Sequence, residues 1–236
     1  MQKVVDWFLP LFLVIGIMFV VLANPEPVAR DALCNELKIC FSSKHAAFWN
    51  NLMYEGGLGV VVSIAFYWLL VKIPESTKRR RLRSFLSRSY AAFRKEVVIQ
   101  FLFASRGSAP LDLVDKITEQ SKFRSYFKQP SELVNGDKWH DVANNISERQ
   151  LYDLLIVTES LRDDIIYVLN NTDIGDERSF LFLQSLRRAI NAHNFSSTDY
   201  DDQKSLMGFF WQIMAGWNPG EGYKEKDPIQ RIIDRI

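Results

Sequence analysis

The sequence has few of the residues from which most metal and enzyme sites are built. Only three His and two Cys occur among its 236 residues. The cysteines, Cys34 and Cys40, lie away from any pair of His, so we expect neither a disulfide framework nor a Cys-rich zinc site. A glycine-rich phosphate loop and a Gly-x-Ser-x-Gly nucleophile elbow are both missing. These gaps predict no cofactor and no metal, and they favour a non-enzymatic protein.

The chain also lacks a large net charge. Its formal charge is +1, so no general attraction to nucleic acid is expected. The total conceals a local asymmetry, because residues 72–95 are dense in Lys and Arg whereas residues 112–202 carry many acids. The mean hydropathy of −0.09 likewise averages an apolar N-terminal third with a charged remainder. The sequence is therefore divided into regions of different character.

The first apolar run extends from Trp7 to Ala23 without a charged residue. With Val4 and Val5 it approaches the ~20 residues that cross a bilayer as a helix. The alternative is a cleaved signal peptide, in which Lys3 would form the basic start and residues 21–23 a loose cleavage site. Because the apolar run is long, we expect a membrane-spanning helix.

The second apolar run extends from Gly57 to Ile73. Aromatic residues precede it, and Tyr67 and Trp68 lie near its far end, as in the aromatic belts of membrane helices. Small residues at Gly59 and Ser63 would let another helix approach closely, including one from a second copy in a homo-oligomer. The alternative is that they are ordinary small residues of a membrane helix. Either way, this run is predicted to be a second span.

Charge sets the expected orientation of these spans. Basic residues follow the second run, and so the positive-inside rule places that side in the cytoplasm. With two spans, the N-terminus is cytoplasmic as well, and the connecting loop, residues 24–56, faces outside. Cys34 and Cys40 then lie where oxidation is feasible. A disulfide between them and two unpaired thiols are both open alternatives.

A basic amphipathic helix is predicted for residues 74–105, with Pro74 ending the span and Thr77 capping the new helix. Apolar residues recur at spacings of three and four, which defines one helix face: Leu82, Phe85, Leu86, Tyr90, Phe93, Val97 and Phe101. The opposite face carries Arg79, Arg80, Arg83, Arg94 and Lys95. We expect the apolar face to pack on the rest of the domain.

Six cations near the predicted membrane surface are candidates for binding anionic headgroups, at about 1 kcal/mol for each Lys or Arg. They are Lys78, Arg79, Arg80, Arg81, Arg83 and Arg88. The alternative is that these cations only fix the topology. Direct nucleic-acid binding ranks last, because no recognition motif accompanies them.

Residues 106–236 predict a cytoplasmic α-helical domain. Helices are expected from Leu111, after a capping box at Ser147–Gln150, near Asp176, after Ser196–Ser197, and after Asp227. Residues 218–220 are expected to end the fourth of these, and residues 220–226 to be flexible. No alternating strand pattern is evident. The predicted fold is all-α: a two-helix transmembrane hairpin, residues 1–73, followed by a helical bundle.

Arg188 and His193 lie on one predicted helix in an Arg-x4-His arrangement. This resembles the motif of the HEPN superfamily, helical domains that include metal-independent ribonucleases. The resemblance implies that His193 acts on a ribose 2′-hydroxyl while Arg188 holds the phosphate, which fits their chemistry. Ala189 stands where that family usually has a polar residue. The alternative is a helix whose last turn favours cations.

The layout as a whole is similar to two-transmembrane effectors of bacterial anti-phage systems, including retron-type systems. The resemblance rests on the two spans, the basic junction and the helical domain. It implies an inner-membrane protein that a cytosolic protein or ribonucleoprotein partner restrains, and that damages the membrane when released. Two alternatives are a membrane-tethered ribonuclease using Arg188 and His193, and a membrane scaffold or regulator without toxicity.

Overall fold

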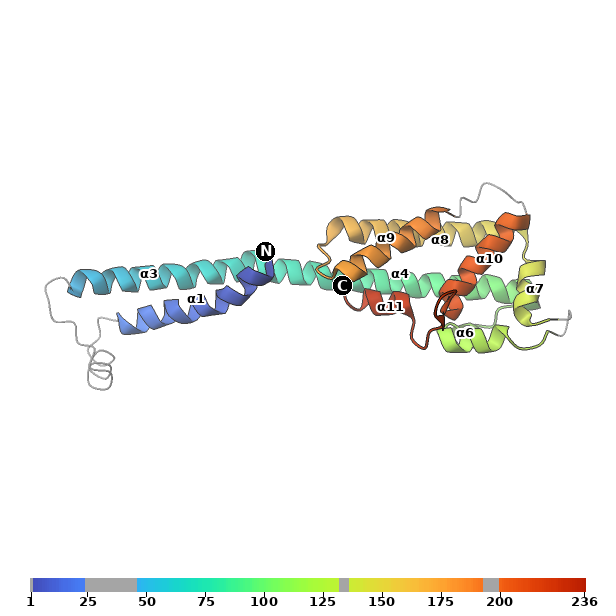
Figure 1. The fold of residues 1–236 in the computed structure, drawn as a ribbon, viewed down its shortest axis with the longest axis horizontal. Helices are drawn as coiled ribbons and strands as arrows, with labels where there is room; N and C mark the ends of the chain where they lie inside the picture. Colours follow the sequence, from blue (N-terminus) through green and yellow to red (C-terminus); the bar gives the residue numbers. More distant parts are fainter. Residues whose placement is uncertain (1, 24–45, 132–135, 193–199) are drawn as a thin grey trace. The chain divides into compact units, whose positions relative to one another are not determined.

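A computed structural model describes residues 2–23, 46–131, 136–192 and 200–236. The described chain is mainly helical, as predicted (Figure 1). Cys34, Cys40 and His193 lie outside the described residues, as do Ser196 and Ser197. The chain divides into two compact units, residues 1–77 and residues 78–236, and each is considered by itself.

The first unit contains α1 (Gln2–Leu22) and α3 (Ala46–Tyr67), which pack along each other. Their apolar side chains lie mostly on the outside: Phe12 is 54% exposed and Leu70, in the following helical turn, is 71% exposed. The helical run Asn51–Arg106 is long and apolar enough to cross a membrane, and only 6% of its most apolar 18-residue window is buried. The shorter apolar helix Phe8–Val21 falls below that length. One candidate span is therefore established, and the second remains a prediction.

Pro74 does not end the helix, contrary to the sequence prediction. The chain continues from the π-helix η1 (Trp68–Lys72) into α4 (Ile73–Arg106), so Thr77 lies inside a helix and does not cap one. A proline lacks an N–H and its ring clashes with the carbonyl four residues earlier. The preceding turn widens, and the Ile73 N–H bonds to the Trp68 carbonyl five residues back. This wider turn accommodates the proline without a break. The start of α3 also differs, because Ala46 lies well inside the predicted loop.

The second unit is built on α4. The predicted apolar face is confirmed, because Leu82, Leu86, Tyr90, Phe93, Val97 and Phe101 are buried and Phe85 packs against the core. Further helices cover α4: α5 (Leu111–Ile117), α6 (Gln120–Phe127), α7 (Lys138–Asn145), α8 (Glu148–Asn171), α9 (Glu177–Ala192), α10 (Tyr200–Ala215) and α11 (Pro228–Ile233). The capping box that begins α8 is present, with Ser147 and Gln150 bonded reciprocally as predicted.

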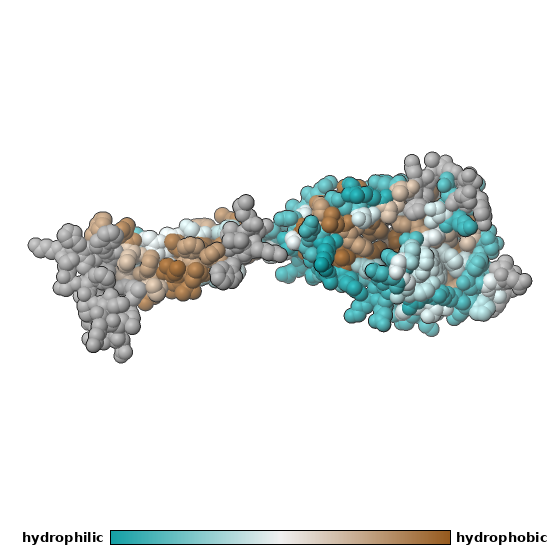
Figure 2. Space-filling model, viewed as in Figure 1, coloured by the Kyte–Doolittle hydropathy of each residue, from teal (hydrophilic) through white to brown (hydrophobic). Residues whose placement is uncertain are grey.

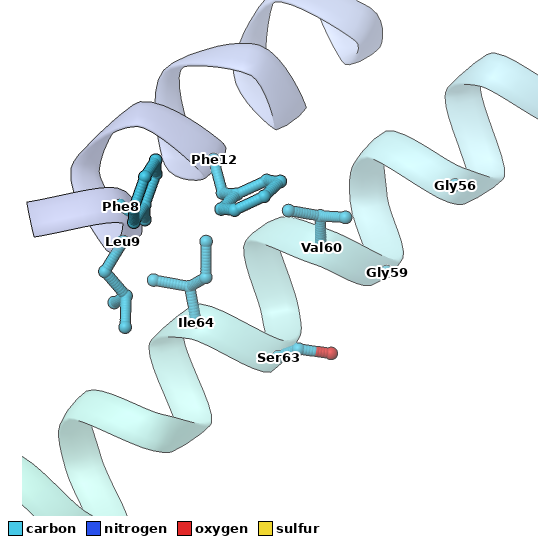
Figure 3. A pocket seen from close by; sticks show the side chains of 8 residues that line it. All are labelled: Phe8, Leu9, Phe12, Gly56, Gly59, Val60, Ser63 and Ile64. Atoms are coloured by element: carbon cyan, nitrogen blue, oxygen red, sulfur yellow. The ribbon is translucent and has the colours of Figure 1, made fainter. Parts of the chain in front are cut away.

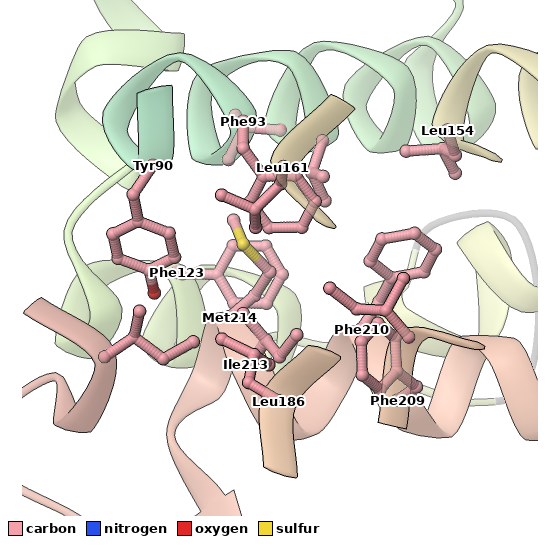
Figure 4. Close-up of a cluster of buried hydrophobic side chains, with 14 of the residues drawn as sticks. Tyr90, Phe93, Phe123, Leu154, Leu161, Leu186, Phe209, Phe210, Ile213 and Met214 are labelled. Atoms are coloured by element: carbon pink, nitrogen blue, oxygen red, sulfur yellow. The ribbon is translucent and has the colours of Figure 1, made fainter. Parts of the chain in front are cut away.

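The core of this unit is rich in aromatic side chains (Figure 4). Phe101 of α4 lies at its centre, with ring centroids 6.2 Å from Phe123, 5.3 Å from Trp139 and 5.7 Å from Phe210. Trp139 of α7 thus packs against the core from outside it. The helices that carry Phe123 and Trp139, α6 and α7, were missed because each is short and shows little more than one apolar turn.

The chain after α10 forms a small hairpin and not a continuing helix. Gly216 has φ of 65° and turns the chain, so the helix ends before residues 218–220, where the sequence predicted its end, and Trp217 starts the strand β1 (Trp217–Asn218). This strand pairs antiparallel with β2 (Gly222–Tyr223). The Lys224 N–H also bonds to the Gly216 carbonyl at 2.9 Å. The stretch predicted to be flexible is therefore hydrogen-bonded.

Arg94 is buried, at 5% exposure, although the sequence prediction placed it on the polar face of α4. Its Nη1 lies 2.8 Å from Asp227 Oδ2. Its Nε and Nη2 donate to the Thr118 carbonyl at 2.9 and 2.6 Å, and Nη2 also donates to the Met214 carbonyl at 3.4 Å. The prediction for Arg94 was wrong because the helical pattern contains no information about Asp227, a carboxylate from the far end of the chain that meets this position.

The two carboxylate oxygens of Asp227 accept hydrogen bonds from two different helices, α11 and α4. Oδ1 accepts the backbone N–H groups of Ile229 and Gln230 at 2.9 and 3.2 Å and so caps α11. Oδ2 accepts from Arg94 and, at 2.8 Å, from the Tyr90 hydroxyl. Burial raises the pKa of Tyr90 far above its usual range, so the hydroxyl stays protonated and remains a donor. The pair thereby joins α4 to α11.

Replacing Asp227 by Asn tests this junction. The variant leaves the Arg94 charge buried without its counter-charge, so the free energy of unfolding is expected to fall by about 3 kcal/mol or more. Asp115→Asn is the matched control, because the Lys95–Asp115 pair is exposed at 45% and 66% and should cost less than about 1 kcal/mol. Urea unfolding of the full chain in detergent, followed by Trp fluorescence, measures both. Equal losses in the two variants would contradict the structural role given to Asp227.

Candidate functional site

An apolar groove runs between α1 and α3 (Figure 3). Its volume is about 620 Å³. Phe8, Leu9 and Phe12 line it from α1, and Gly56, Gly59, Val60, Ser63 and Ile64 line it from α3. In Figure 3 the ring of Phe12 points toward Val60, whereas Gly56 and Gly59 offer only backbone. Bulky apolar side chains therefore form the α1 wall of the groove, whereas two glycines leave part of the α3 wall without side chains.

The close contact between α1 and α3 is made by a different pair of glycines. A Cβ on Gly57 would lie 2.8 Å from the Gly16 carbonyl oxygen, and a Cβ on Gly16 would lie 3.1 Å from Val60 Cγ1. By contrast, a Cβ on Gly59 would meet nothing within 4 Å. Gly59 and Ser63 therefore line the groove and do not form the α1–α3 crossing, and their contact with a helix of another chain stays a prediction.

Sequence reasoning missed Gly16 and Gly57 for a physical reason. Gly56 and Gly57 are neighbours, and they face directions about 100° apart on a helix. Which of them meets α1 depends on how α3 is rotated, and no pattern in a uniformly apolar helix fixes that rotation. The signal that was available is the presence of one glycine in α1, which marks a place where backbones can meet.

A second groove follows the first along the same helix pair. Its volume is about 490 Å³. Leu9 and Ile64 line both grooves, and the second adds Pro10, Leu13, Trp68, Lys72, Ile73 and Ser76. Lys72, the last residue of η1, is half-buried. Among the described residues that line the two grooves, Lys72 is the one charged side chain.

The basic residues of α4 divide into two sets in the structure. Arg79 Nη2 donates to the Asp173 carbonyl at 3.0 Å, and Arg83 Nη1 donates to the Asp234 carbonyl at 3.4 Å. Arg88 Nε donates within its own helix to the Ser84 carbonyl at 3.3 Å, whereas Lys78, Arg80 and Arg81 are exposed. Three of the six candidates thus hold backbone carbonyls of their own domain, and two of these carbonyls lie outside α4.

The charge pairing of these cations differs from that of cations elsewhere in the second unit. In the described ranges no carboxylate lies within 4 Å of the charged groups of Lys78, Arg80, Arg81, Arg83 and Arg88. Farther along the chain, Lys95, Lys122, Arg162 and Lys224 each pair with a carboxylate. Several cations without a carboxylate partner therefore lie between Lys78 and Arg88 of α4. In Figure 2 the visible face of the second unit is mostly hydrophilic, whereas that of the first unit is largely hydrophobic.

Arg188, the candidate phosphate-binding residue, lies exposed on α9, and its Nη2 donates to Gln184 Oε1 at 3.2 Å. His193 lies outside the described residues, so the structure does not test the pair. The same holds for a disulfide between Cys34 and Cys40. Within residues 2–23, 46–131, 136–192 and 200–236, no group of three or more His, Cys, Asp or Glu is placed to hold a metal ion.

Comparison with protein families, with characterised proteins and with solved structures found no match to this chain. The features of this chain that bear on its function are therefore the two grooves of the first unit and the cations of α4 that have no carboxylate partner.

Neutralising Arg80 and Arg81 to Gln tests the cationic surface. With about 1 kcal/mol for each cation near an anionic membrane, the two changes should weaken vesicle binding of residues 78–236 by roughly 25-fold. Arg162→Gln is the control, because that guanidinium already pairs with Asp163 at 3.0 Å. Co-sedimentation with vesicles containing phosphatidylglycerol measures the binding, which should also fall with added salt. A similar loss in the double variant and in Arg162→Gln would contradict a localised surface.

Proposed function

We propose that the chain is an inner-membrane protein with two spans, whose cytoplasmic helical domain binds a soluble partner. The observation that carries this proposal is the combination of outward-facing apolar side chains on α1 and α3 with unpaired cations in the turns that follow. Water would solvate such a helix pair poorly, whereas hydrocarbon would cover it at no cost. The cations would then lie at the cytoplasmic surface.

Support for the second span comes from α1 itself. Its 21 residues correspond to about 30 Å of helix at 1.5 Å per residue, which matches the hydrocarbon thickness. It also packs on α3 through backbone contact at Gly16 and Gly57, the kind of close approach that holds membrane helices together. A helix in such contact with a spanning helix is most simply placed in the same bilayer.

Support for partner binding comes from the surface of the helical domain. Tyr152 and Ile156 lie one turn apart on α8 and are 63% and 45% exposed. An aromatic and an aliphatic side chain on one face are what a soluble partner commonly buries at an interface. We infer that the partner, a protein or ribonucleoprotein, restrains the protein through this domain, and that release lets the hairpin perturb the membrane, as in the antiviral effectors whose layout it resembles.

Topology is the first experimental test. In intact cells a membrane-impermeant maleimide should label Cys34 and Cys40 after mild reduction, because they lie in the predicted external loop. In a Cys34→Ser/Cys40→Ser background, Gln2→Cys and Tyr223→Cys should be labelled only after the cells are permeabilised. Labelling of Gln2→Cys in intact cells would instead mean that α1 does not span the membrane or spans in the opposite direction.

The membrane-perturbing activity is tested by inducing the full chain and following a voltage-sensitive dye together with total RNA from the same culture. We expect depolarisation with intact RNA. Gly59→Asp should abolish it, because a charge inside the predicted span costs up to about 3 kcal/mol, and Arg188→Ala should leave it unchanged. Cut RNA with an intact membrane potential would instead support the ribonuclease alternative, and no effect of any form would support the non-toxic scaffold.

A further inference from the structure

Two aromatic side chains lie side by side on the β1–β2 hairpin of the second unit. Trp217 pairs directly with Tyr223 in antiparallel register, and directly opposed residues of such a pair point to the same face. Both residues are exposed, at 36% and 39%. Within the described part of the chain, no other aromatic ring packs on Trp217. The hairpin therefore presents a tryptophan and a tyrosine together to solvent.

A polar stripe on α6 holds this hairpin in place. Gln120, Arg124 and Lys128 follow one another at spacings of four residues, so they lie along one side of the helix. Gln120 Nε2 donates to the Lys224 carbonyl at 2.8 Å. Farther along the stripe, Arg124 Cζ and Lys128 Nζ lie 4.7 and 4.2 Å from the centre of the Tyr223 ring. The ring and the two cations are therefore fixed beside one another.

The two cations contact a ring and not a carboxylate. In residues 2–23, 46–131, 136–192 and 200–236, neither the Arg124 nor the Lys128 side chain donates a hydrogen bond or lies within 4 Å of a carboxylate. By contrast, Lys122 of the same helix pairs with Glu119 at 2.8 Å. An aromatic ring attracts a cation through its quadrupole but has no net charge. The Tyr223 ring therefore positions both cations without neutralising them, and an anion is needed to do so.

We propose that this aromatic–cationic surface, made of Trp217, Tyr223, Arg124 and Lys128, binds single-stranded nucleic acid carried by the soluble partner. A base stacks on the Trp217 ring, and phosphates lie beside the two cations. Planar bases alternate with phosphates along such a strand, and exposed aromatic rings together with cations are what recognise this combination. The inference rests on the proposed function in one respect, because the partner supplies the strand. It deepens that function by naming the chemistry of the contact and its place.

The sequence ranked nucleic-acid binding last because no motif accompanies the cations of residues 78–88. The surface proposed here uses different cations, and it exists only because the fold brings α6 against a hairpin that the sequence did not predict. A nearly neutral chain can bind a strand in this way, since the attraction comes from two local charges and from stacking. An acidic peptide would also match the charges, but it would leave the Trp217 indole without a planar partner.

The test is fluorescence anisotropy of the full chain in a neutral detergent, with labelled oligouridylate and oligodeoxythymidylate of about ten nucleotides. We expect saturable binding that weakens as salt is added, because phosphate contacts release counterions. RNA and DNA share the bases and phosphates that this surface reads, and the tighter of the two identifies which one the partner supplies. A duplex of the same length should bind at least fivefold more weakly, because its bases are already stacked on one another.

Two variants separate stacking from charge. Trp217→Leu keeps an apolar side chain but removes the planar ring, and it should weaken binding at least fivefold, the low end for the loss of one stacked base. Lys128→Gln removes one phosphate contact, so the slope of log K against log salt should become shallower by about 0.7. Both residues are exposed, and circular dichroism checks that each variant keeps its helical content.

Each variant has a matched control. Lys122→Gln removes the same charge from the same helix, at a position where the ammonium already pairs with Glu119. Phe103→Leu removes an aromatic ring from α4, where Phe103 is 46% exposed. Both controls should bind the oligonucleotides as the wild type does and with the same salt dependence.

Three results would overturn the proposal. One is a wild-type chain that binds neither oligonucleotide, and another is the same change of salt slope in Lys122→Gln as in Lys128→Gln. The third is displacement of the strand by an equal concentration of oligoglutamate together with unchanged binding by Trp217→Leu, which would assign the surface to acidic peptides. The maleimide labelling and the membrane-potential measurement involve no oligonucleotide, so they test the proposed function separately from this surface.

Discussion

A guanidinium buried in a helical domain must meet a counter-charge, and the second unit is arranged around this requirement. Arg94 lies in the longest helix, and Asp227 reaches it while capping α11. The other nitrogens of Arg94 hold the carbonyls of Thr118 and Met214, which end α5 and lie near the end of α10. One side chain thus fixes the ends of three further elements against α4. The apolar core around Phe101 packs the helices together, and this ion pair holds the ends of α5, α10 and α11 against α4.

The first unit follows a different rule, because its apolar side chains face outward. Without a hydrophobic core of its own, it relies on backbone approach at Gly16 and Gly57 to hold α1 against α3. Close packing at one level leaves a groove at the next, where Gly59 faces open space. The helix pair is therefore in close contact at these glycines and open beside them. The anchoring role proposed for the hairpin draws on this arrangement.

Much of the helical content could be predicted from the sequence, since the periodic apolar faces of α4, α8 and α9 are long enough to read directly. The short helices α6 and α7 could not, because a single apolar turn does not distinguish a helix from a loop. Arg94 was misplaced because its partner lies 133 residues away, and a local pattern contains no information about such a distance. Of the candidate site, the cationic turns and the Gly59–Ser63 face were visible in the sequence. The groove itself was not, because it depends on the rotation of α3 about its own axis.

The separation between Arg94 and Asp227 also has a consequence for biosynthesis. The ribosome adds Arg94 long before Asp227, and during that interval the Arg94 guanidinium lacks the carboxylate with which it is buried. The contact that joins α4 to α11 therefore forms only after almost the whole described chain has emerged, whereas the apolar helices α1 and α3 are complete much earlier. If these helices enter a membrane as proposed, their insertion would precede completion of the domain, which would acquire its final surface when it is already tethered. A partner that recognises that surface would accordingly meet the protein at the membrane and not before.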